Sequence, residues 1–461
     1  MGYVGYDCVR FFEPRSRPRG KDGKEVEMKD VLRVPESWFG LFETVVAVDH
    51  FFQRVVVVTF LRVPEGYLTS NTGSDEKKMQ ELEKVYEAGK LRLLKILEVI
   101  QNPHIPLPTQ GPLTPRTAKD YTSNIGREGY ESHVRTLKHQ ITTGDIIQAV
   151  PSQRIARPTD LAPFNIYRRL RTVNPSPYMF FLDTGDFQIV GASPEVLVKE
   201  EEGRIITHPI AGTVRRGNSE AEDGVLAEQL RASVKDRAEH VMLVDLARND
   251  VNRVCDPLTT RVDRLMIVQK FSHVQHLTSE VSGVLRQGKT RFDAFRSIFP
   301  AGTVSGAPKV KAMELISTLE RETRGVYAGA VGYFGYNNVD PFDLVPRNAS
   351  EPGSGGNRTA VEKEGAMDTC IALRTMLVKD SVVYLQAGGG IVFDSDPGEE
   401  YEETINKLSA NMRTIEQMEG IVYAEQQQAA GKSGEGVGKG SVEAAGVGKV
   451  RAPEVVGLGG E

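Results

Sequence analysis

The chain has 461 residues, of which 39% are hydrophobic and 26% are charged, so a globular core of ordinary size can form. Its formal net charge of -5 argues against a general nucleic-acid binder, because no strongly basic surface would attract phosphates. The N-terminus has no basic stretch followed by an apolar one, and the longest apolar runs are of strand length. We therefore expect a cytoplasmic protein without a membrane span.

The three cysteines, Cys8, Cys255 and Cys370, are widely spaced and odd in number. Such a set provides neither a disulfide framework nor a cysteine-rich metal site. We expect reduced thiols packed inside the protein.

The first part of the chain is predicted to contain a hairpin and a long helix. Residues 45–61 are dense in β-branched and aromatic side chains, which indicates a strand, a turn and a second strand. Residues 75–101 repeat apolar side chains with the period of a helix. Five prolines within 103–115 end that helix. We place a domain boundary there and take 1–115 as the N-terminal region of the fold.

Predicted elements follow one another more closely from residue 130 onward. In chain order we expect a helix at 130–143, a strand at 146–155, a hairpin of 187–198 with 204–209, one long helix at 221–246, a glycine-rich strand at 326–336, a hairpin of 369–378 with 381–387, and a helix at 399–418. These elements would form the main domain, residues 116–423.

Two segments differ from this pattern. Residues 337–365 are rich in Pro, Gly, Ser and Asn and are too long for an ordinary loop, so we expect a flexible insert. Residues 424–461 contain few large apolar side chains and predict a disordered tail.

Two predicted helices each carry a pair of carboxylates. Asp236 and Glu239 are three residues apart, as are Glu400 and Glu403, so each pair shares one helix face. Such oxygen ligands suit Mg2+ if both pairs face one cavity. The alternative is that both pairs are solvated helix faces, which is the more common use of this spacing.

Glycine-rich segments at 210–213, 299–309 and 387–391 have backbone N–H groups that can bind an anion. Arg374 could pair with a carboxylate through two parallel hydrogen bonds. Together with the acidic pairs, these features indicate a small dianionic substrate, although any single loop could be a simple turn. His276 lies in a strand-like run and suits the removal of a ring proton near neutral pH; the alternative is a structural histidine.

Five motifs in this order resemble those of the chorismate-utilising enzymes, most closely the family of anthranilate synthase large subunits. They are HPIAGT at 208–213, DRAEH with LARND within 236–250, FPAGTVSGAPK at 299–309, YAGAVGY at 327–333 and DTCIALR at 368–374. The resemblance spans about 1–418 apart from the insert. It implies an α+β fold, in which a large antiparallel β-sandwich with flanking helices surrounds one buried active site.

The resemblance also implies the substrate, chorismate, and the cofactor, Mg2+. Glu239 and Glu403 would bind the ion directly, and Asp236 and Glu400 would hold its waters. Glu195 would protonate the departing ring hydroxyl, His276 would remove the ring proton, and Thr303 would line the same site. The residues implied in substrate binding are Ala211, Gly212, Thr213, Tyr327, Arg374, Gly388, Gly389, Gly390 and Lys407.

Two positions distinguish the members of this group. Isochorismate and salicylate synthases resemble this chain but carry a water-activating lysine where it has Gln148. Aminodeoxychorismate synthases carry a nucleophilic lysine where it has Ala211. Neither side chain present here can do that chemistry, so ammonia is the expected nucleophile. Anthranilate and pyruvate are the expected products, in the first step of tryptophan biosynthesis, catalysed by a lyase.

Ammonia in this family comes from a glutamine amidotransferase, and the sequence shows no glutaminase half, so we expect a separate amidotransferase subunit. Half of the family's tryptophan feedback site is matched by Asn174, Pro175, Pro177, Tyr178 and Met179. The sequence shows no counterpart of the upstream half, so feedback inhibition stays open. Two alternatives also stay open: an aminodeoxychorismate synthase, and a catalytically impaired chorismate-binding subunit.

Overall fold

The computed structural model describes residues 1–18, 24–63, 75–117, 120–201, 203–271, 274–336, 338–339, 362–363 and 365–434. Most of the predicted insert and everything after residue 434 lie outside the described residues. The insert connects two paired strands, β16 (Ala330–Phe334) and β19 (Met367–Ile371), whose register joins Phe334 to Met367.

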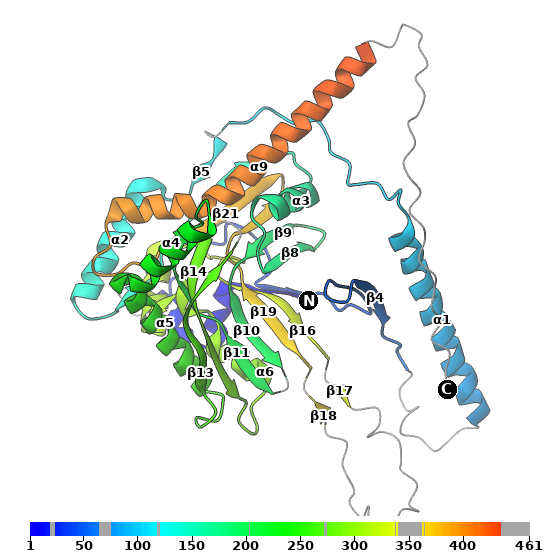
Figure 1. The fold of residues 1–461 in the computed structure, drawn as a ribbon, viewed down its shortest axis with the longest axis horizontal. Helices are drawn as coiled ribbons and strands as arrows, with labels where there is room; N and C mark the ends of the chain where they lie inside the picture. Colours follow the sequence, from blue (N-terminus) through cyan, green and yellow to red (C-terminus); the bar gives the residue numbers. More distant parts are fainter. Residues whose placement is uncertain are drawn as a thin grey trace, which may run out of the picture.

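Two antiparallel sheets form the centre of the molecule (Figure 1). The nine-stranded sheet runs in the order β12 (Ile210–Arg215), β14 (Val274–Val284), β11 (Arg204–Thr207), β10 (Val196–Glu201), β19, β16, β1 (Gly2–Val4) and β2 (Ser37–Phe39), with β13 (Arg261–Lys270) paired to β14. The six-stranded sheet runs in the order β5 (Thr122–Ser123), β7 (Ser152–Pro158), β21 (Val382–Gly388), β20 (Thr375–Lys379), β9 (Gln188–Ser193) and β8 (Tyr178–Asp183). The expected antiparallel α+β sandwich is confirmed.

Side chains alternate across each strand, so each sheet buries one face against the other sheet and one against helices. Between the sheets, Tyr3, Val331 and Cys370 of the larger sheet pack with Ile189 and Leu377 of the smaller one. The result is four layers, with a helix layer on each outer face.

The outer face of the larger sheet is covered by α5 (Val234–Asn252), α6 (Arg291–Ile298) and α7 (Lys309–Glu320). The smaller sheet is covered by α3 (Pro163–Val173) and α9 (Pro397–Gly434). In α9, Leu408, Ile415 and Val422 recur every seven residues and therefore share one buried face. Burial of each such side chain stabilises the fold by about 1.5–3 kcal/mol.

The expected strand over 187–198 is two strands in different sheets. It divides into β9 and β10, with Pro194 and Glu195 between them. Proline has no N–H for a ladder hydrogen bond, which favours an interruption of the strand at this point. The hairpin of β10 with β11 is confirmed.

The expected strand over 369–378 also changes sheets, from β19 to β20, and the hairpin that follows joins β20 to β21. Arg374 lies at this second crossing with a φ of 50°, in the left-handed region that breaks strand geometry. Ile371 N donates to Glu195 O over 3.0 Å, and Ala192 N donates to Arg374 O over 3.3 Å. The two crossings therefore lie side by side.

The expected long helix over 221–246 is wrong, because it consists of α4 (Glu220–Ala232) and α5. Ser233 separates them in an extended conformation, and its side chain accepts a hydrogen bond from Asp236 N. This N-cap starts a new helix, so Asp236 and Glu239 lie in the first turns of α5.

Other helices confirm the prediction, and some of them have shifted ends. α1 (Asp75–Gln101) has the expected bounds, and α2 (Gly126–Thr142) starts four residues before 130. The strand expected at 146–155 is β6 (Gln148–Ala149) and β7. α9 extends beyond 418 to Gly434, so the first part of the predicted disordered tail is helical.

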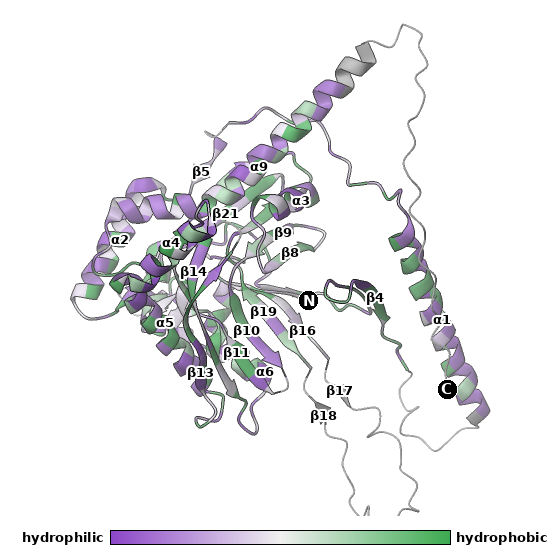
Figure 2. Cartoon of the chain, in the orientation of Figure 1, coloured by the Kyte–Doolittle hydropathy of each residue, from purple (hydrophilic) through white to green (hydrophobic). Residues whose placement is uncertain are grey.

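The N-terminal hairpin of β3 (Thr44–Asp49) and β4 (Arg54–Thr59) lies beside α1 and away from the two sheets (Figure 1). Hydrophobic residues recur along both elements in Figure 2, and many are exposed, including Phe51 at 88%. Among the described helices, none has both the length and the apolar composition needed to cross a bilayer. Cys8, Cys255 and Cys370 are buried free thiols, as predicted.

Candidate active site

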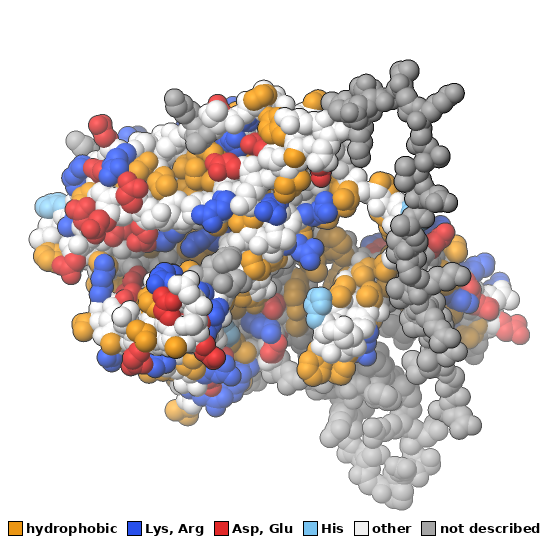
Figure 3. Space-filling model, turned by 45° about the horizontal axis from the view of Figure 1, so that its top comes forward, with side chains coloured by type: hydrophobic (Ala, Val, Ile, Leu, Met, Phe, Trp, Pro, Cys, Tyr) orange, Lys and Arg blue, Asp and Glu red, His pale blue; other side chains and the backbone are white. Residues whose placement is uncertain are grey.

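One cavity of about 1020 Å³ lies where the two sheet crossings face α5 and α9. Figure 3 shows Lys and Arg side chains gathered along a hollow on this side of the molecule. The predicted site residues that line the cavity are Gln148, Glu195, Ala211, Gly212, Thr213, Asp236, Glu239, His276, Thr303, Tyr327, Arg374, Gly388, Gly390, Glu400, Glu403 and Lys407. Segments more than 250 residues apart in the sequence thus meet at one site.

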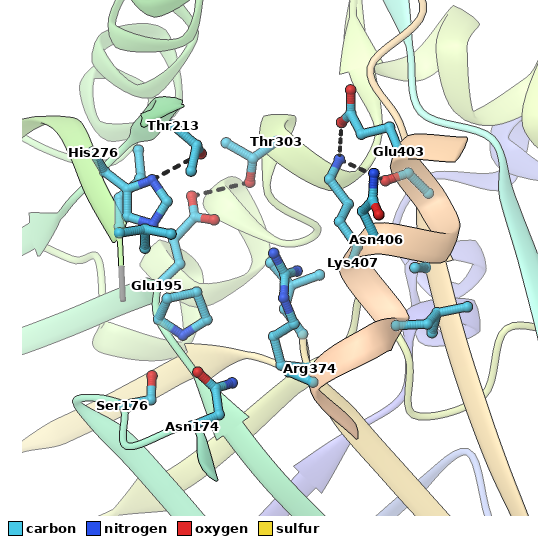
Figure 4. Close-up of a pocket in the computed structure, with 18 of the residues that line it drawn as sticks. Asn174, Ser176, Glu195, Thr213, His276, Thr303, Arg374, Glu403, Asn406 and Lys407 are labelled. Atoms are coloured by element: carbon cyan, nitrogen blue, oxygen red, sulfur yellow. Dashed lines mark hydrogen bonds and ion pairs between the residues drawn. The ribbon is translucent and has the colours of Figure 1, made fainter. Parts of the chain in front are cut away.

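Glu195, at the first sheet crossing, is 6% exposed. Its Oε1 accepts a hydrogen bond from Thr303 Oγ1 over 3.0 Å (Figure 4). Burial raises the pKa of Glu195 to about 8, although the Thr303 hydrogen bond and the positive charge of Arg374 oppose this shift. The carboxyl therefore carries a proton near neutral pH and can act as a general acid.

His276, on β14, has the opposite chemistry. Its Nδ1 lies 3.0 Å from Gly212 O and 3.0 Å from Thr213 Oγ1. Because a carbonyl oxygen only accepts, Nδ1 carries the proton of the neutral ring and Nε2 keeps its lone pair. Burial lowers the pKa of His276, and Arg374 adds to this effect. The imidazole is thus neutral and can act as a base.

Gly212 shapes this part of the site. It lies at an irregularity between Ala211 and Thr213 where β12 pairs with β14, and its φ is +66°. A Cβ atom there would lie 2.9 Å from Asp236 Oδ1. The positive φ favours glycine, and a side chain here would also displace the carboxylate of Asp236.

The carboxylates come from two helices. On α5, Glu239 Oε1 accepts a hydrogen bond from Gln148 Nε2 over 2.9 Å. Burial raises the pKa of Glu239, and the nearby charges of Glu403 and Asp236 raise it further. Since Glu403 lies on α9, the two acidic pairs influence each other across the cavity.

On α9, Glu403 pairs with Lys407 over 2.5 Å, and Lys407 Nζ also donates to Gly388 O over 2.9 Å (Figure 4). Burial raises the pKa of Glu400, a hydrogen bond with Ser395 opposes this shift, and the negative charge of Glu403 adds to it. Glu400 Oε2 is buried and has no hydrogen-bond partner among the described residues. A buried carboxylate oxygen without a partner is costly, which favours a cation in this region.

The glycine-rich loop after β21 runs between these acidic groups. A Cβ at Gly389 would lie 2.7 Å from Glu400 Oε2, and one at Gly390 would lie 2.4 Å from Gln148 Nε2. Gly389 does not line the cavity, and its N–H donates to the buried Tyr130 hydroxyl over 3.0 Å. A side chain at either glycine would therefore displace the end of the Glu400 side chain or that of Gln148, which donates to Glu239.

Comparison with known proteins connects this cavity to one family. A family model described as chorismate binding enzyme matches residues 1–350 and 355–413, which include both sheet crossings and both acidic pairs. The chain belongs to the chorismate-binding enzyme family.

Within the chorismate-binding enzyme family, similar proteins share a name. Anthranilate synthase component 1 of Saccharomyces cerevisiae is 55% identical over 422 residues, or 91% of this chain and 73% of that protein. The probable anthranilate synthase component 1 of Schizosaccharomyces pombe is 52% identical over 427 residues, or 93% of this chain and 77% of that protein.

Solved structures of chorismate-binding enzymes agree with the fold. Anthranilate synthase component I from Streptococcus pneumoniae is 36% identical, with a TM-score of 0.66 over 89% of this chain and 79% of that chain. The menaquinone-specific isochorismate synthase from Escherichia coli is 22% identical, with a TM-score of 0.56 over 75% of this chain and 70% of that chain. The latter likeness concerns the fold alone.

The residues predicted from the family's tryptophan motif are spread over two environments. Asn174 and Pro175, at the end of α3, line the cavity, whereas Pro177, Tyr178 and Met179 do not. The Tyr178 hydroxyl instead donates to Asp368 Oδ1 over 2.9 Å between the sheets. The motif therefore links the cavity edge to the space between the sheets.

Several cavity residues of this chorismate-binding enzyme are absent from the predicted set. Lys235 neighbours Asp236, and Asn406 neighbours Lys407, so both could have been found by extending the motifs. Arg169 lies on α3, which carries none of the predicted site residues, and Arg413 lies on α9, six residues after Lys407. Only the packing of α3 beside α9 brings these two together at the cavity.

Proposed function

We propose that this chain is the chorismate-converting component of anthranilate synthase, a lyase that forms anthranilate and pyruvate from chorismate and ammonia. One observation carries the proposal. A single cavity holds a protonated carboxyl at Glu195 and a neutral imidazole at His276. An acid and a base of this kind suit the loss of a hydroxyl followed by the loss of a ring proton.

The choice of nucleophile rests on two positions. Gln148 donates to Glu239 and has no basic nitrogen, so it does not activate water. Ala211 lines the cavity with a methyl group, so no covalent bond to the substrate forms there. Ammonia is then the attacking group. The high identity to anthranilate synthase component 1 proteins supports the same choice.

The cavity suits a dianion. The Arg374 guanidinium and the Lys407 ammonium both line it, and each can bind a carboxylate of chorismate. The Tyr327 hydroxyl and the backbone N–H groups near Gly212 and Gly390 add neutral donors.

Mg2+ is the proposed cofactor, and the donor set fits it. Among the described residues, no three His, Cys, Asp or Glu side chains enclose an ion by themselves. Mg2+ does not require three, because it commonly takes one or two carboxylates and keeps waters and substrate oxygens. Glu239 and Glu403 would bind it directly, with Asp236 and Glu400 holding its waters. When bound, the ion would neutralise the ring carboxylate of the substrate.

The reaction balances with these residues. Glu195 gives its proton to the ring hydroxyl, which leaves as water while ammonia forms the new C–N bond. The ammonium group formed in this way then loses one proton, which restores the protonated Glu195 carboxyl. His276 Nε2 then takes the proton from the ring and the enolpyruvyl C–O bond breaks. The enolpyruvate gains the proton that the imidazolium gives up and becomes pyruvate, which restores the neutral His276. Chorismate and ammonia thus give anthranilate, pyruvate and water.

The partner and the location are part of the proposal. Ammonia would come from a separate glutamine amidotransferase subunit, and tryptophan is a candidate feedback inhibitor through the motif that contains Tyr178. Three free, buried cysteines are in keeping with a reducing cytoplasm.

The proposal is tested by incubating the purified chain with chorismate, Mg2+ and ammonium while product fluorescence and mass are recorded. We expect anthranilate and an equal amount of pyruvate. An aminated product that retains the enolpyruvyl group would instead identify an aminodeoxychorismate synthase. Binding of chorismate without turnover would identify an impaired subunit.

A further inference from the structure

Arg324 lies behind the cavity and is not among the residues that line it. Its side chain is 1% exposed and makes four hydrogen bonds. Nε and Nη2 donate to the two carboxylate oxygens of Glu320, over 2.9 and 2.7 Å. Nη1 donates to Val304 O over 2.9 Å, and Nη2 donates to Val150 O over 2.7 Å. One planar group therefore joins three separate segments.

The two carbonyl contacts fix the neighbours of catalytic-site residues. Val304 follows Thr303, which donates to Glu195 over 3.0 Å. Val150 lies two residues after Gln148, which donates to Glu239 over 2.9 Å. Arg324 thus binds the carbonyl of the residue next to Thr303, the partner of the proposed acid. It also binds the carbonyl two residues after Gln148, the partner of a proposed metal ligand.

The same guanidinium packs on aromatic rings. The central carbon of the guanidinium, Cζ, lies 4.5 Å from the centre of the Tyr6 ring and 5.7 Å from that of the Tyr327 ring. Tyr327 lines the cavity. Glu320 Oε1 extends the contact to β7, since it also accepts from Ser152 N over 2.7 Å and from Ser152 Oγ over 2.9 Å. The N-terminal segment, β7, the Thr303 loop and α7 all meet at this pair.

A buried ion pair of this kind adds little net stability, because desolvation offsets the attraction between the charges. Its geometry is nevertheless restrictive, since a guanidinium has a fixed fork of five donors. We propose that Arg324 is a positioning residue, which sets the distance between the Thr303–Glu195 pair and the Gln148–Glu239 pair. This inference rests on the proposed function, in which those pairs supply the acid and a metal ligand.

Lysine is the informative substitution at this position. Arg324→Lys keeps one positive charge beside Glu320, but a single ammonium nitrogen does not reach Glu320, Val304 O and Val150 O in the same planar arrangement. The charge stays balanced while the positioning contacts are lost.

Arg157 offers a matched control. It is also 1% exposed, donates to Glu419 Oε2 over 2.9 Å and packs over the Tyr121 ring at 4.9 Å. It joins β7 to α9, but it does not line the cavity, and its contacts hold none of the proposed catalytic groups. Arg157→Lys therefore measures what the loss of a buried guanidinium costs the fold alone.

The test compares both variants with the wild type by thermal unfolding, ammonium-dependent anthranilate formation and amide hydrogen exchange. We expect both to lower Tm, but only Arg324→Lys to lower kcat, by about 10-fold to 100-fold, as for a small misplacement of reacting groups. We expect the chorismate KM to change by less than about threefold, because the binding groups Arg374 and Lys407 are untouched. Exchange should rise at 148–152 and 302–305 in Arg324→Lys alone.

The pH profile separates positioning from a general loss of structure. A displaced Thr303 no longer lowers the pKa of Glu195, so the basic limb of kcat should move to higher pH in Arg324→Lys and stay in place in Arg157→Lys. Equal Tm losses with unchanged kcat and unchanged profile in both variants would overturn the inference. A wild type that forms no anthranilate would overturn the proposed function instead. Exchange at the two segments would then still decide whether Arg324 holds them.

Discussion

Glu195 and His276 share the physical cause of their reactivity, which is burial. Removal from water disfavours the charged form of each group, so the carboxyl gains a proton and the imidazole loses one. Arg374 contributes in the same direction at His276 and opposes the shift at Glu195. The site therefore keeps an uncharged acid and an uncharged base ready at one pH.

Catalysis should lose its acid as Glu195 ionises. With a pKa of about 8, kcat is expected to be constant below that pH and to fall above it. Glu195→Gln should lower kcat by about 10²-fold to 10⁴-fold and remove this basic limb. A pH series of initial rates measures both effects. A limb that persists unchanged in the variant would assign it to another group.

The stability of the protein should also depend on pH through Glu195. Because the folded pKa of Glu195 lies above its unfolded value of 4.5, the protonated carboxyl favours the native state at low pH. That contribution is lost as pH rises from the unfolded to the folded pKa. Thermal unfolding of the wild type and of Glu195→Gln is measured from about pH 5 to about pH 8. As the pH rises, the Tm of the variant should increase relative to that of the wild type. A constant difference across the range would contradict the raised pKa.

Secondary-structure elements bring the two acidic pairs into position. The Ser233 cap ends α4 and starts α5 at an angle that one continuous helix would not allow. The sequence pattern concealed this break, because apolar side chains continue with helical spacing through both helices. Only the capping residue marks it.

Removing the cap should affect both the fold and the ion. Ser233→Ala is expected to cost about 1 kcal/mol and to raise the Mg2+ concentration needed for half-maximal activity, because Asp236 N loses its partner. Ser219 caps α4 in a similar way, since its side chain accepts a hydrogen bond from Glu222 N, but it lies away from the acidic pairs. Ser219→Ala is therefore the control. Urea unfolding and Mg2+ titration of both variants measure this. An equal Mg2+ effect in both would reject the explanation.

Neighbouring glutamates on α9 allow a second comparison. Glu403→Gln should raise the Mg2+ requirement by about 10-fold or more, since a proposed ligand loses its charge. Glu402→Gln changes a residue that pairs with Arg127 outside the cavity, so its requirement should stay near that of the wild type. Normal Mg2+ dependence of Glu403→Gln would remove it from the metal site.

At the scale of the whole molecule, two sheets exchange strands at the points where Glu195 and Arg374 lie. Periodicity predicted the strands well but placed each crossing inside one continuous strand, because sheet membership depends on long-range pairing rather than local pattern. Sequence reasoning predicted fewer than half of the residues that line the cavity. The predicted ones lie where the proposed chemistry or the backbone conformation, such as the positive φ of Gly212, restricts the residue type. Arg324 carried no recognisable signal, because two of its partners are backbone carbonyls from other segments, and its pairing with Glu320, four residues earlier, resembles an ordinary helix-surface ion pair.

The claim that Glu195 acts as the acid and His276 as the base is tested most directly by rapid-quench mass spectrometry. His276→Ala is mixed with chorismate, Mg2+ and ammonium. Glu195 is intact in this variant, so amination should proceed, and the aminated, non-aromatic intermediate should accumulate while anthranilate and pyruvate appear slowly. Release of anthranilate at the wild-type rate, with no intermediate, would show that His276 is not the base and would contradict the mechanism.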